Sequence, residues 1–327
     1  MTVIRLSRRA VAAGLLAAPS MVRAQSGWPS QVVKLVVPFT PGGSTDVLAR
    51  LLANRLERVF PGRGFVIENR PGAGGSVAAA QVARSDPDGH TLMMGHIGTL
   101  AFNPSLYPAL PYNPVRDFQP VALVASVPNI LAINPKLPAT DFAQFVAHAR
   151  ANPGLLNYSS GGMGSAAHIA GAYLCHKAGI EAVHVPYRGT APSVNDLVAG
   201  VVQFTLTGGP AVLPLAGGGQ LRALGVASLA RAGFAPELPT LADSGLPGFE
   251  AEQWYGIVAP ARTPAAVVDQ LNRAINALLA APDFREVLDK DGAVALPRSP
   301  DEFRQLIAAE IPLWREIIRA ANITAGG

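Results

Sequence analysis

The sequence predicts an α/β fold made of two lobes. The chain has 327 residues, of which 49% are hydrophobic and 15% charged, a composition typical of globular proteins. A single hydrophobic core rarely grows beyond about 250–300 residues, so two cores are expected. Strand-like and helix-like segments alternate along most of the chain, which favours a mostly parallel sheet flanked by helices in each lobe.

The segment 1–24 has the pattern of a secretory signal peptide. Arg5, Arg8 and Arg9 form a positive start, Ala10–Ala18 is an apolar run, and Val22–Ala24 fits a cleavage site. The apolar run is shorter than the roughly 20 residues that span a membrane. The paired arginines also resemble a twin-arginine signal, and both export routes stay open. We expect cleavage near Ala24 and export of the remaining chain.

The charge balance argues against a nucleic-acid partner. The chain has 26 Lys and Arg against 22 Asp and Glu, and four of its arginines lie in the expected signal. The mature chain is therefore close to neutral and has no clustered basic footprint. The lone cysteine, Cys175, excludes an internal disulfide and a cysteine-rich zinc site, and is expected to be a small core residue. The histidines show no metal-ligand spacing, so neither a metal nor a cofactor is expected.

Short apolar runs rich in β-branched residues predict the strands. In the first part of the chain they are Val32–Val37, Phe65–Glu68, Thr91–Gly95, Val121–Val127 and Ile130–Ile133, with Pro128 interrupting the last two. Later they are Leu155–Ser159, Val183–Pro186, Val201–Leu206, Leu224–Ala227 and Gln253–Val258.

Apolar residues at helical spacing predict the helices. The first helix follows the glycine-rich turn Pro41–Asp46, and Ser44 or Thr45 can cap it. The others are expected at Ser76–Arg84, Phe142–Ala151, Ala166–Ala178, Ser193–Ala199, Pro264–Ala280, Asp283–Lys290 and Asp301–Ala321.

Two strands, near 127 and near 252, are expected to connect the lobes. Lobe 1 would comprise 25–126 and 252–327, and lobe 2 would comprise 127–251. Crossover strands of this kind predict a hinged clamp, with its cleft at the carboxyl ends of the strands.

Two glycine-rich turns, Pro41–Asp46 and Ser160–Ser165, each join a strand to a helix. Free N–H groups in the first turn of a helix carry partial positive charge, and glycine lets a ligand approach the backbone. Each turn is therefore a candidate seat for a carboxylate, with a plain tight connection as the alternative. Gly162, Gly164 and Ala167 also match a dinucleotide fingerprint, but such matches occur by chance in glycine-rich chains.

Two further side chains follow these turns and strands. His168, one turn into the second helix, could donate to a ligand, act as a base or simply pack. Arg188, at the end of a strand, could complement an anion or lie solvated in its loop. No serine lies in a G-x-S-x-G elbow and no motif pairs two carboxylates, so nothing indicates an enzyme.

Short motifs are spread in order through the mature chain. They are VVPFTPGGSTD at 36–46, ENRPGAGG at 68–75, PDGHTL at 87–92, NPSLY at 103–107, DFQPV at 117–121, HVPYRG at 184–189 and PGFE at 247–250. Together they resemble the tripartite tricarboxylate transporter substrate-binding family, also called Bug-type receptors. The resemblance implies a two-lobe type II periplasmic-binding-protein fold and a periplasmic location. It also implies delivery of a small organic acid to a two-component membrane permease.

The resemblance further implies which residues bind the ligand, one wall of the cleft coming from each lobe. The set is Phe39, Pro41, Gly42, Gly43, Ser44, Thr45, Asp46, Ser160, Gly161, Gly162, Gly164, Ser165, His168 and Thr207. Thr207 stands where the family often has Asp, and a threonine cannot pair with a cation. An amino-acid ligand is therefore disfavoured, while dicarboxylates, tricarboxylates and aromatic acids stay open.

Two other functions remain as alternatives to transport. A ligand-sensing receptor for signalling would have the same clamp. A secreted hydrolase of carboxylate esters would instead show turnover. The chain is expected to act as a monomer.

Overall fold

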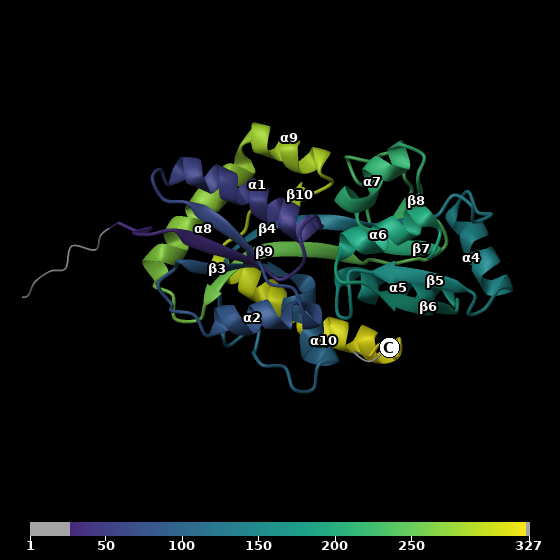
Figure 1. Cartoon of the computed structure of the whole chain (residues 1–327), viewed down its shortest axis with the longest axis horizontal. Helices are drawn as coiled ribbons and strands as arrows, with labels where there is room; N and C mark the ends of the chain where they lie inside the picture. The colour runs from purple at the N-terminus through teal and green to yellow at the C-terminus, as the bar shows by residue number, and fades with distance from the viewer. Residues whose placement is uncertain (1–26, 325–327) are drawn as a thin grey trace, which may run out of the picture.

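The computed structural model describes residues 27–324, so the predicted signal peptide lies outside the described residues. One twisted sheet runs through two lobes (Figure 1). In the order in which they pair, its strands are β2 (Phe65–Asn69), β1 (Val33–Val37), β3 (Thr91–His96), β9 (Glu252–Pro260), β4 (Phe118–Ile133), β7 (Phe204–Gly208), β5 (Leu156–Ser160) and β6 (Ala182–Pro186). Two more strands, β8 (Arg222–Val226) and β10 (Val294–Ala295), also pair with β4.

The sheet is mixed. Its outer strands are parallel, since β1 pairs in parallel with β2 and β3, and β5 with β6 and β7. The long strands at its centre are antiparallel, because β9 pairs with β3 and β4, and β4 pairs with β7. The parallel pairing predicted from the strand–helix alternation therefore holds at the two ends of the sheet. Antiparallel pairing replaces it where β4 and β9 connect the lobes.

Helices cover both faces of the sheet in each lobe (Figure 1). In lobe 1, one face packs against α1 (Ser44–Val59), α8 (Ala265–Ala280) and α9 (Pro282–Lys290), and the other against α2 (Ser76–Ala83), α3 (Asn103–Leu106) and α10 (Pro300–Ala320). In lobe 2, one face packs against α4 (Phe142–Ala151) and α5 (Ala166–Ala178), and the other against α6 (Thr190–Ala199) and α7 (Gly209–Gly217). A 3₁₀ turn, Ala73–Gly75, and a π-type turn, Gly98–Phe102, complete lobe 1.

Strand β4 runs through both lobes without a break, so the predicted interruption at Pro128 is wrong. Residues 118–128 of β4 pair with β9, and the residues beyond pair with β7 and β8. The strand changes partners immediately after Pro128. Proline has no N–H group to donate to a neighbouring strand. A strand tolerates that loss at Pro128, because the hydrogen bonds to β9 end there and those to β7 begin at the next residue.

In each lobe the helices present one apolar face to the sheet, and these faces pack with the strands to form the core. Leu48, Leu52 and Leu56 of α1 are buried against the sheet, and full burial of such a side chain contributes about 1.5–3 kcal/mol. Cys175 in α5 packs at the edge of the lobe 2 core, as predicted, and burial raises the pKa of its thiol to about 12.

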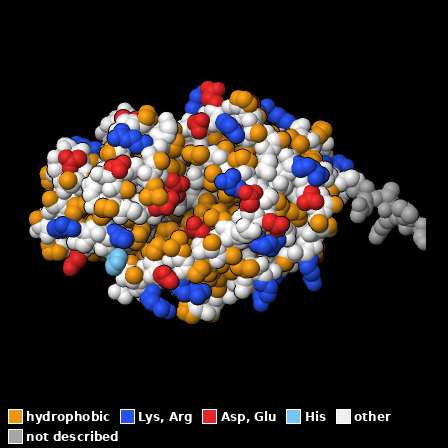
Figure 2. All heavy atoms as spheres, turned by 180° about the vertical axis from the view of Figure 1, so that it is seen from behind, with side chains coloured by type: hydrophobic (Ala, Val, Ile, Leu, Met, Phe, Trp, Pro, Cys, Tyr) orange, Lys and Arg blue, Asp and Glu red, His pale blue; other side chains and the backbone are white. Residues whose placement is uncertain are grey.

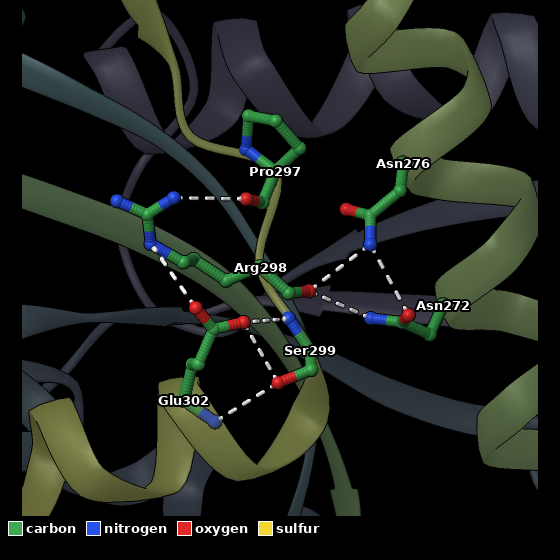
Figure 3. Close-up of polar contacts among 6 residues, drawn as sticks. All are labelled: Asn272, Asn276, Pro297, Arg298, Ser299 and Glu302. Carbon is green, nitrogen blue, oxygen red and sulfur yellow. Dashed lines mark hydrogen bonds and ion pairs between the residues drawn. The ribbon is translucent and has the colours of Figure 1, made fainter.

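Helix α10 begins with a capping box (Figure 3). The Ser299 hydroxyl accepts from the Glu302 amide at 3.2 Å, and the Glu302 carboxylate accepts from the Ser299 amide at 2.8 Å. Asn272 and Asn276 of α8 donate to the carbonyl oxygen of Arg298 at 2.9 and 3.0 Å. These bonds fix the start of α10 against α8.

The surface carries charges of both signs. On the face opposite to that of Figure 1, basic and acidic side chains are interspersed around an apolar centre (Figure 2). Within residues 27–324, no helix has the length and apolarity needed to cross a membrane.

Candidate ligand-binding cleft

A small cavity of about 30 Å³ lies between the lobes. Its lining residues come from both lobes and from the strands that connect them: Phe39, Thr40, Gly43, Ser44, Thr45, His96, Gly161, Ser165, Ala166, Ala167, Gly189, Thr190, Thr207, Gln253 and Tyr255. None of these lining residues is Asp, Glu, Lys or Arg. A charged ligand would therefore meet no charged side chain here. Its polar partners would be backbone dipoles, hydroxyl groups, the Gln253 amide and the neutral His96 ring.

Three helices point their N-termini at this cavity. The N-cap residues of α1, α5 and α6 are Gly43, Ser165 and Gly189, and all three line it. The predicted cap of α1, Ser44 or Thr45, is wrong, because the helix already begins at Ser44. The first amides of a helix have no intrahelical partner, and the helix dipole adds partial positive charge at that end. This convergence suits a carboxylate or a similar anion. The third terminus was missed from the sequence, because α6 begins at Thr190 rather than at the predicted Ser193.

Asp46 holds the turn of lobe 1 from behind. Its carboxylate accepts from the Gly42 amide at 3.0 Å, from Arg50 at 3.0 Å and from Asn69 at 2.9 Å. Burial raises the pKa of Asp46, but the hydrogen bonds from Arg50, Asn69 and Gly42 outweigh it and leave the pKa below its ordinary value. The negative charge of Asp46 is therefore neutralised away from the cavity.

Two stacked histidines hold the turn of lobe 2. The rings of His168 and His184 lie 4.1 Å apart, centroid to centroid. The Gly164 amide donates to Nδ1 of His168 at 3.2 Å, and Nε2 of His184 lies 2.7 Å from the Ser160 hydroxyl. Burial lowers the pKa of His168 to about 4 and that of His184 to about 3, with His168 adding to the latter. His168 thus packs on His184 and supports this turn.

A buried hydrogen-bond chain forms the floor of the cavity. Oε1 of Gln253 accepts from Tyr255 at 2.5 Å and lies 3.1 Å from Nε2 of His96. The Gly98 amide donates to Nδ1 of His96, so the ring hydrogen is on Nε2. Gln253 in turn donates to Asn129, whose side chain donates to the Ala251 carbonyl oxygen. The chain thus links the cavity to β4 and β9, the strands that join the lobes.

No motif predicted this floor. Gln253 and Tyr255 are single residues at alternate positions of a strand that is otherwise apolar after its first residue, Glu252. The one usable signal is that alternation, which puts both side chains on the same face of β9.

The predicted site residues fall into two groups. Those that line the cavity are Phe39, Gly43, Ser44, Thr45, Gly161, Ser165 and Thr207. Those that lie outside its lining are Pro41, Gly42, Asp46, Ser160, Gly162, Gly164 and His168. Of the second group, Asp46, Ser160, Gly164 and His168 hold the two turns in place.

The lobes meet closely around the cavity, with backbone against backbone. A Cβ atom on Gly74 would lie 2.8 Å from the Met163 carbonyl oxygen, and one on Gly98 would lie 2.7 Å from that of Gly164. A Cβ atom on Gly189 would overlap the Thr40 hydroxyl. The structure is therefore a closed form of the clamp, and glycine permits the contact.

A larger hollow of about 900 Å³ lies between α7 and α9, away from the three helix N-termini. Its charged lining residues are four acids and two bases: Glu237, Glu286, Asp289, Asp291, Arg222 and Lys290. The acids outnumber the bases and Lys290 is already paired with Glu286, so size does not make this hollow the better carboxylate site. In the described part of the chain, no group of His, Cys, Asp or Glu could hold a metal ion.

Comparison with known proteins agrees with this geometry. Residues 48–323 match the family described as tripartite tricarboxylate transporter family receptor. Protein BugT of Bordetella pertussis is 37% identical over 89% of this chain and 90% of its own. The structure of Rpa4515 of R. palustris with adipate has a TM-score of 0.88 and 38% identity, over 91% of this chain and 99% of its own. MatC of Rhodopseudomonas palustris with bound malate has a TM-score of 0.84 and 35% identity, over 89% and 99%.

These similarities cover nearly the whole described chain and agree on fold and family. They confirm the predicted two-lobe α/β architecture and the resemblance to Bug-type receptors. The chain belongs to the tripartite tricarboxylate transporter receptor family, whose members are solute-binding receptors rather than enzymes.

Proposed function

We propose that this protein captures a small organic acid between its lobes and delivers it to a two-component membrane permease. The observation that carries the proposal is the convergence of three helix N-termini on a cavity without charged side chains. Similar proteins bound to adipate and malate support a carboxylate as the ligand class. Hydrogen bonds to a charged group contribute about 1.5–3 kcal/mol each, so several of them suffice for firm binding.

The location and organisation of the receptor belong to the same proposal. The segment 1–24 would direct export to the periplasm and be cleaved near Ala24. The lobe division at 127 and 252 is supported by β4, which changes partners after Pro128, and by β9, which begins at Glu252. The receptor would act as a monomer, with no metal or cofactor.

Thr207 narrows the ligand class. It is buried in the cavity wall, and no carboxylate lines the cavity. An ammonium group would therefore find no partner charge there, and its desolvation would be uncompensated. We propose an acid without an amino group.

The test is a thermal-shift panel of organic acids on the mature protein, followed by calorimetry on the acids that bind. Binding to the folded state raises the melting temperature with the logarithm of ligand concentration over Kd. Carboxylates should stabilise the protein, and sugars and cations should not. A response to sugars or cations alone would refute the proposal.

The variant Gly43→Val tests the site itself. A Cβ atom there would lie 3.3 Å from the Thr190 hydroxyl across the cavity, so the larger valine side chain must intrude into the ligand space. We expect affinity for the acid to fall at least about tenfold, or about 1.4 kcal/mol. The control Gly217→Val places the same side chain in open space and should bind normally. Equal affinity in both variants by calorimetry would contradict the assignment.

A further inference from the structure

One side chain, that of Gln253, lies between the floor of the cavity and the strands that join the lobes. It is 6% exposed and is the second residue of β9, which begins at Glu252. In the ladder with β4 it lies opposite Val127, and the next pair, Pro128 and Glu252, is the last before β4 pairs with β7. Gln253 therefore lies at the connection of the lobes as well as in the cavity wall.

On the cavity side, the amide oxygen of Gln253 accepts two hydrogen bonds. The Tyr255 hydroxyl donates at 2.5 Å, and Nε2 of His96 donates at 3.1 Å. An amide oxygen has two lone pairs, so these two donors fill its capacity. The His96 ring also packs edge-on against Phe39, with ring centroids 5.1 Å apart. Since Phe39, His96 and Tyr255 all line the cavity, Gln253 holds much of its floor in position.

On the hinge side, the amide nitrogen of Gln253 donates to the side chain of Asn129. Asn129 is 1% exposed and is not among the residues that line the cavity. Its own amide donates to the Ala251 carbonyl oxygen at 2.6 Å, and its backbone carbonyl accepts from the Ala227 amide at 2.8 Å. With the lobe division proposed above, the hydrogen bond between Gln253 and Asn129 therefore crosses from lobe 1 to lobe 2.

The lobes pack closely around this amide. A Cβ atom on Gly208, at the end of β7, would lie 2.7 Å from the Ser44 hydroxyl oxygen and 3.2 Å from Nε2 of Gln253. Ser44 begins α1 in lobe 1, Thr207 precedes Gly208 in lobe 2, and both Ser44 and Thr207 line the cavity. A change in the angle between the lobes at Gln253 would thus displace the polar groups of one wall relative to those of the other.

We propose that Gln253 is a positioning residue that couples the angle between the lobes to the binding of the acid. Its hydrogen bond with Asn129 holds the lobes at the angle at which the N-termini of α1, α5 and α6 face one cavity, and its oxygen holds the floor of that cavity. This inference rests on the proposed function, which places the acid there. The effect of Gln253 on affinity then passes through Asn129 and the hinge.

The first experiment breaks the hinge bond from outside the cavity. The probe is the acid that stabilises the wild-type protein most in a thermal-shift panel that includes adipate and malate. Asn129→Leu removes the acceptor of the Gln253 amide and should weaken binding of that acid roughly tenfold by calorimetry. Gln253→Met should lose at least as much, and the double variant no more than Gln253→Met alone, because both changes break the same bond. Normal affinity in Asn129→Leu, or losses that multiply in the double variant, would overturn the inference.

The variant Gln253→Glu tests the same bond without an apolar replacement. A protonated carboxyl group keeps an oxygen that accepts from Tyr255 and His96 and a hydroxyl that donates to Asn129, whereas an ionised one has no donor. Burial raises the pKa of a carboxyl group. Affinity in this variant should therefore rise toward the wild-type value as the pH falls from about 8 to about 6, by up to about tenfold. Because this variant keeps the wild-type bonds at the lower pH, it remains informative if Asn129→Leu does not fold.

The wild-type groups around Gln253 do not titrate in this range. The titratable groups in contact with it are His96 and Tyr255, and no Asp, Glu, Lys or Arg is among the residues that line the cavity. Burial lowers the pKa of His96 to about 4 and raises the pKa of Tyr255. Wild-type affinity should be constant over this range, and Gln253→Met should stay equally weakened. Repulsion between the acid and the introduced carboxylate would give the same pH dependence but leave Gln253→Met at wild-type affinity, which would refute a positioning role.

The matched control is Gln305→Glu on α10. Gln305 is exposed, and within residues 27–324 its side chain forms no hydrogen bond. This variant should match the wild-type affinity at every pH, and urea unfolding checks that each variant is folded. If the wild-type protein binds an acid and only the expected losses are missing, the role of Gln253 falls and the proposed function stands. If no acid of the panel stabilises the wild-type protein, both fall.

Discussion

At the residue scale, burial holds three histidines near the cleft in their neutral form. Burial lowers the pKa of His96 to about 4, although its hydrogen bond with Gln253 opposes this, and it lowers those of His168 and His184 to about 4 and about 3. His96 and His168 each accept a backbone amide at Nδ1. Protonation would turn these acceptors into donors and oppose both contacts.

These histidines predict a loss of stability in acid. Their pKa values lie lower in the folded protein than the ordinary value of about 6.5. The stability that they contribute is therefore complete above about pH 6.5 and is lost as the pH falls toward about 4. His96→Gln should show a shallower pH dependence of the free energy of unfolding, measured in urea between about pH 7.5 and about pH 5. The exposed His176→Gln serves as control and should keep the wild-type slope, and an equally steep slope in His96→Gln would contradict the explanation.

The residues of the cleft differ in how far the sequence could predict them. Ser44, Thr45 and Ser165 follow from glycine-rich turns before helices, a local pattern. His96, Gln253 and Tyr255 meet only because β3 and β9 are neighbours, although they are far apart in the sequence. Strand pairing at that separation leaves no mark on a short window of sequence, so the floor could not be predicted.

At the element scale, the start of α10 shows how a local signal fixes a helix. Ser299 and Glu302 lie three residues apart, the spacing of a capping box, and Pro300 stands at the first helical position. The box satisfies amides that the helix leaves without partners. The carbonyl oxygen of Arg298, just before the box, also accepts from Asn272 and Asn276 of α8. These two hydrogen bonds tie the start of α10 to another helix.

Removing the cap should destabilise the protein without affecting the cleft. Ser299→Ala deletes the acceptor of the Glu302 amide, which costs about 1 kcal/mol. Urea unfolding should detect this loss, with ligand affinity unchanged. Ser85→Ala removes an exposed hydroxyl that donates only to the Gln81 carbonyl oxygen and should stay within about 0.5 kcal/mol of the wild type. Equal stability of the two variants would show that the box contributes nothing.

Some elements could not be predicted correctly from the sequence, and the cause in each case is physical. Helix α7 contains Pro214 in its interior, which normally argues against a helix, and it is apolar with little periodicity. Strand β4 was divided at Pro128 because a sequence window cannot see that the strand changes neighbours there. The long amphipathic helices α1, α8 and α10 were predicted well, because each keeps one face in a core.

At the scale of the whole molecule, closure depends on glycine. Gly189 has φ of 125° and touches Thr40 of the other lobe, and Gly74 and Gly98 meet backbone atoms across the cleft. Any side chain at these positions would hold the lobes apart. Since the ligand is to be enclosed between the lobes, this contact is coupled to affinity.

Gly189→Ala should therefore weaken ligand binding at least about tenfold by obstructing closure. A matched control exists in Gly245, which has a similar φ of 119° but nothing within 4 Å of the added Cβ atom. Gly245→Ala should suffer a comparable backbone strain, about 1–3 kcal/mol, and bind the acid normally. Calorimetry and urea unfolding on both variants separate the two effects, and normal binding by Gly189→Ala would contradict the closure argument.

The single cysteine has a practical consequence. Cys175 is partly buried, and with a thiol pKa raised to about 12 it carries almost no reactive thiolate at neutral pH. A cysteine introduced at an exposed position of the glycine-rich turn 71–75, such as Pro71, would then react with a maleimide dye ahead of the native thiol. A dye there would lie near the close approach of Gly74 to Met163 of the other lobe and would respond to a change in that contact. The chain is thus already suited to conversion into a fluorescent biosensor for the acid proposed as its ligand.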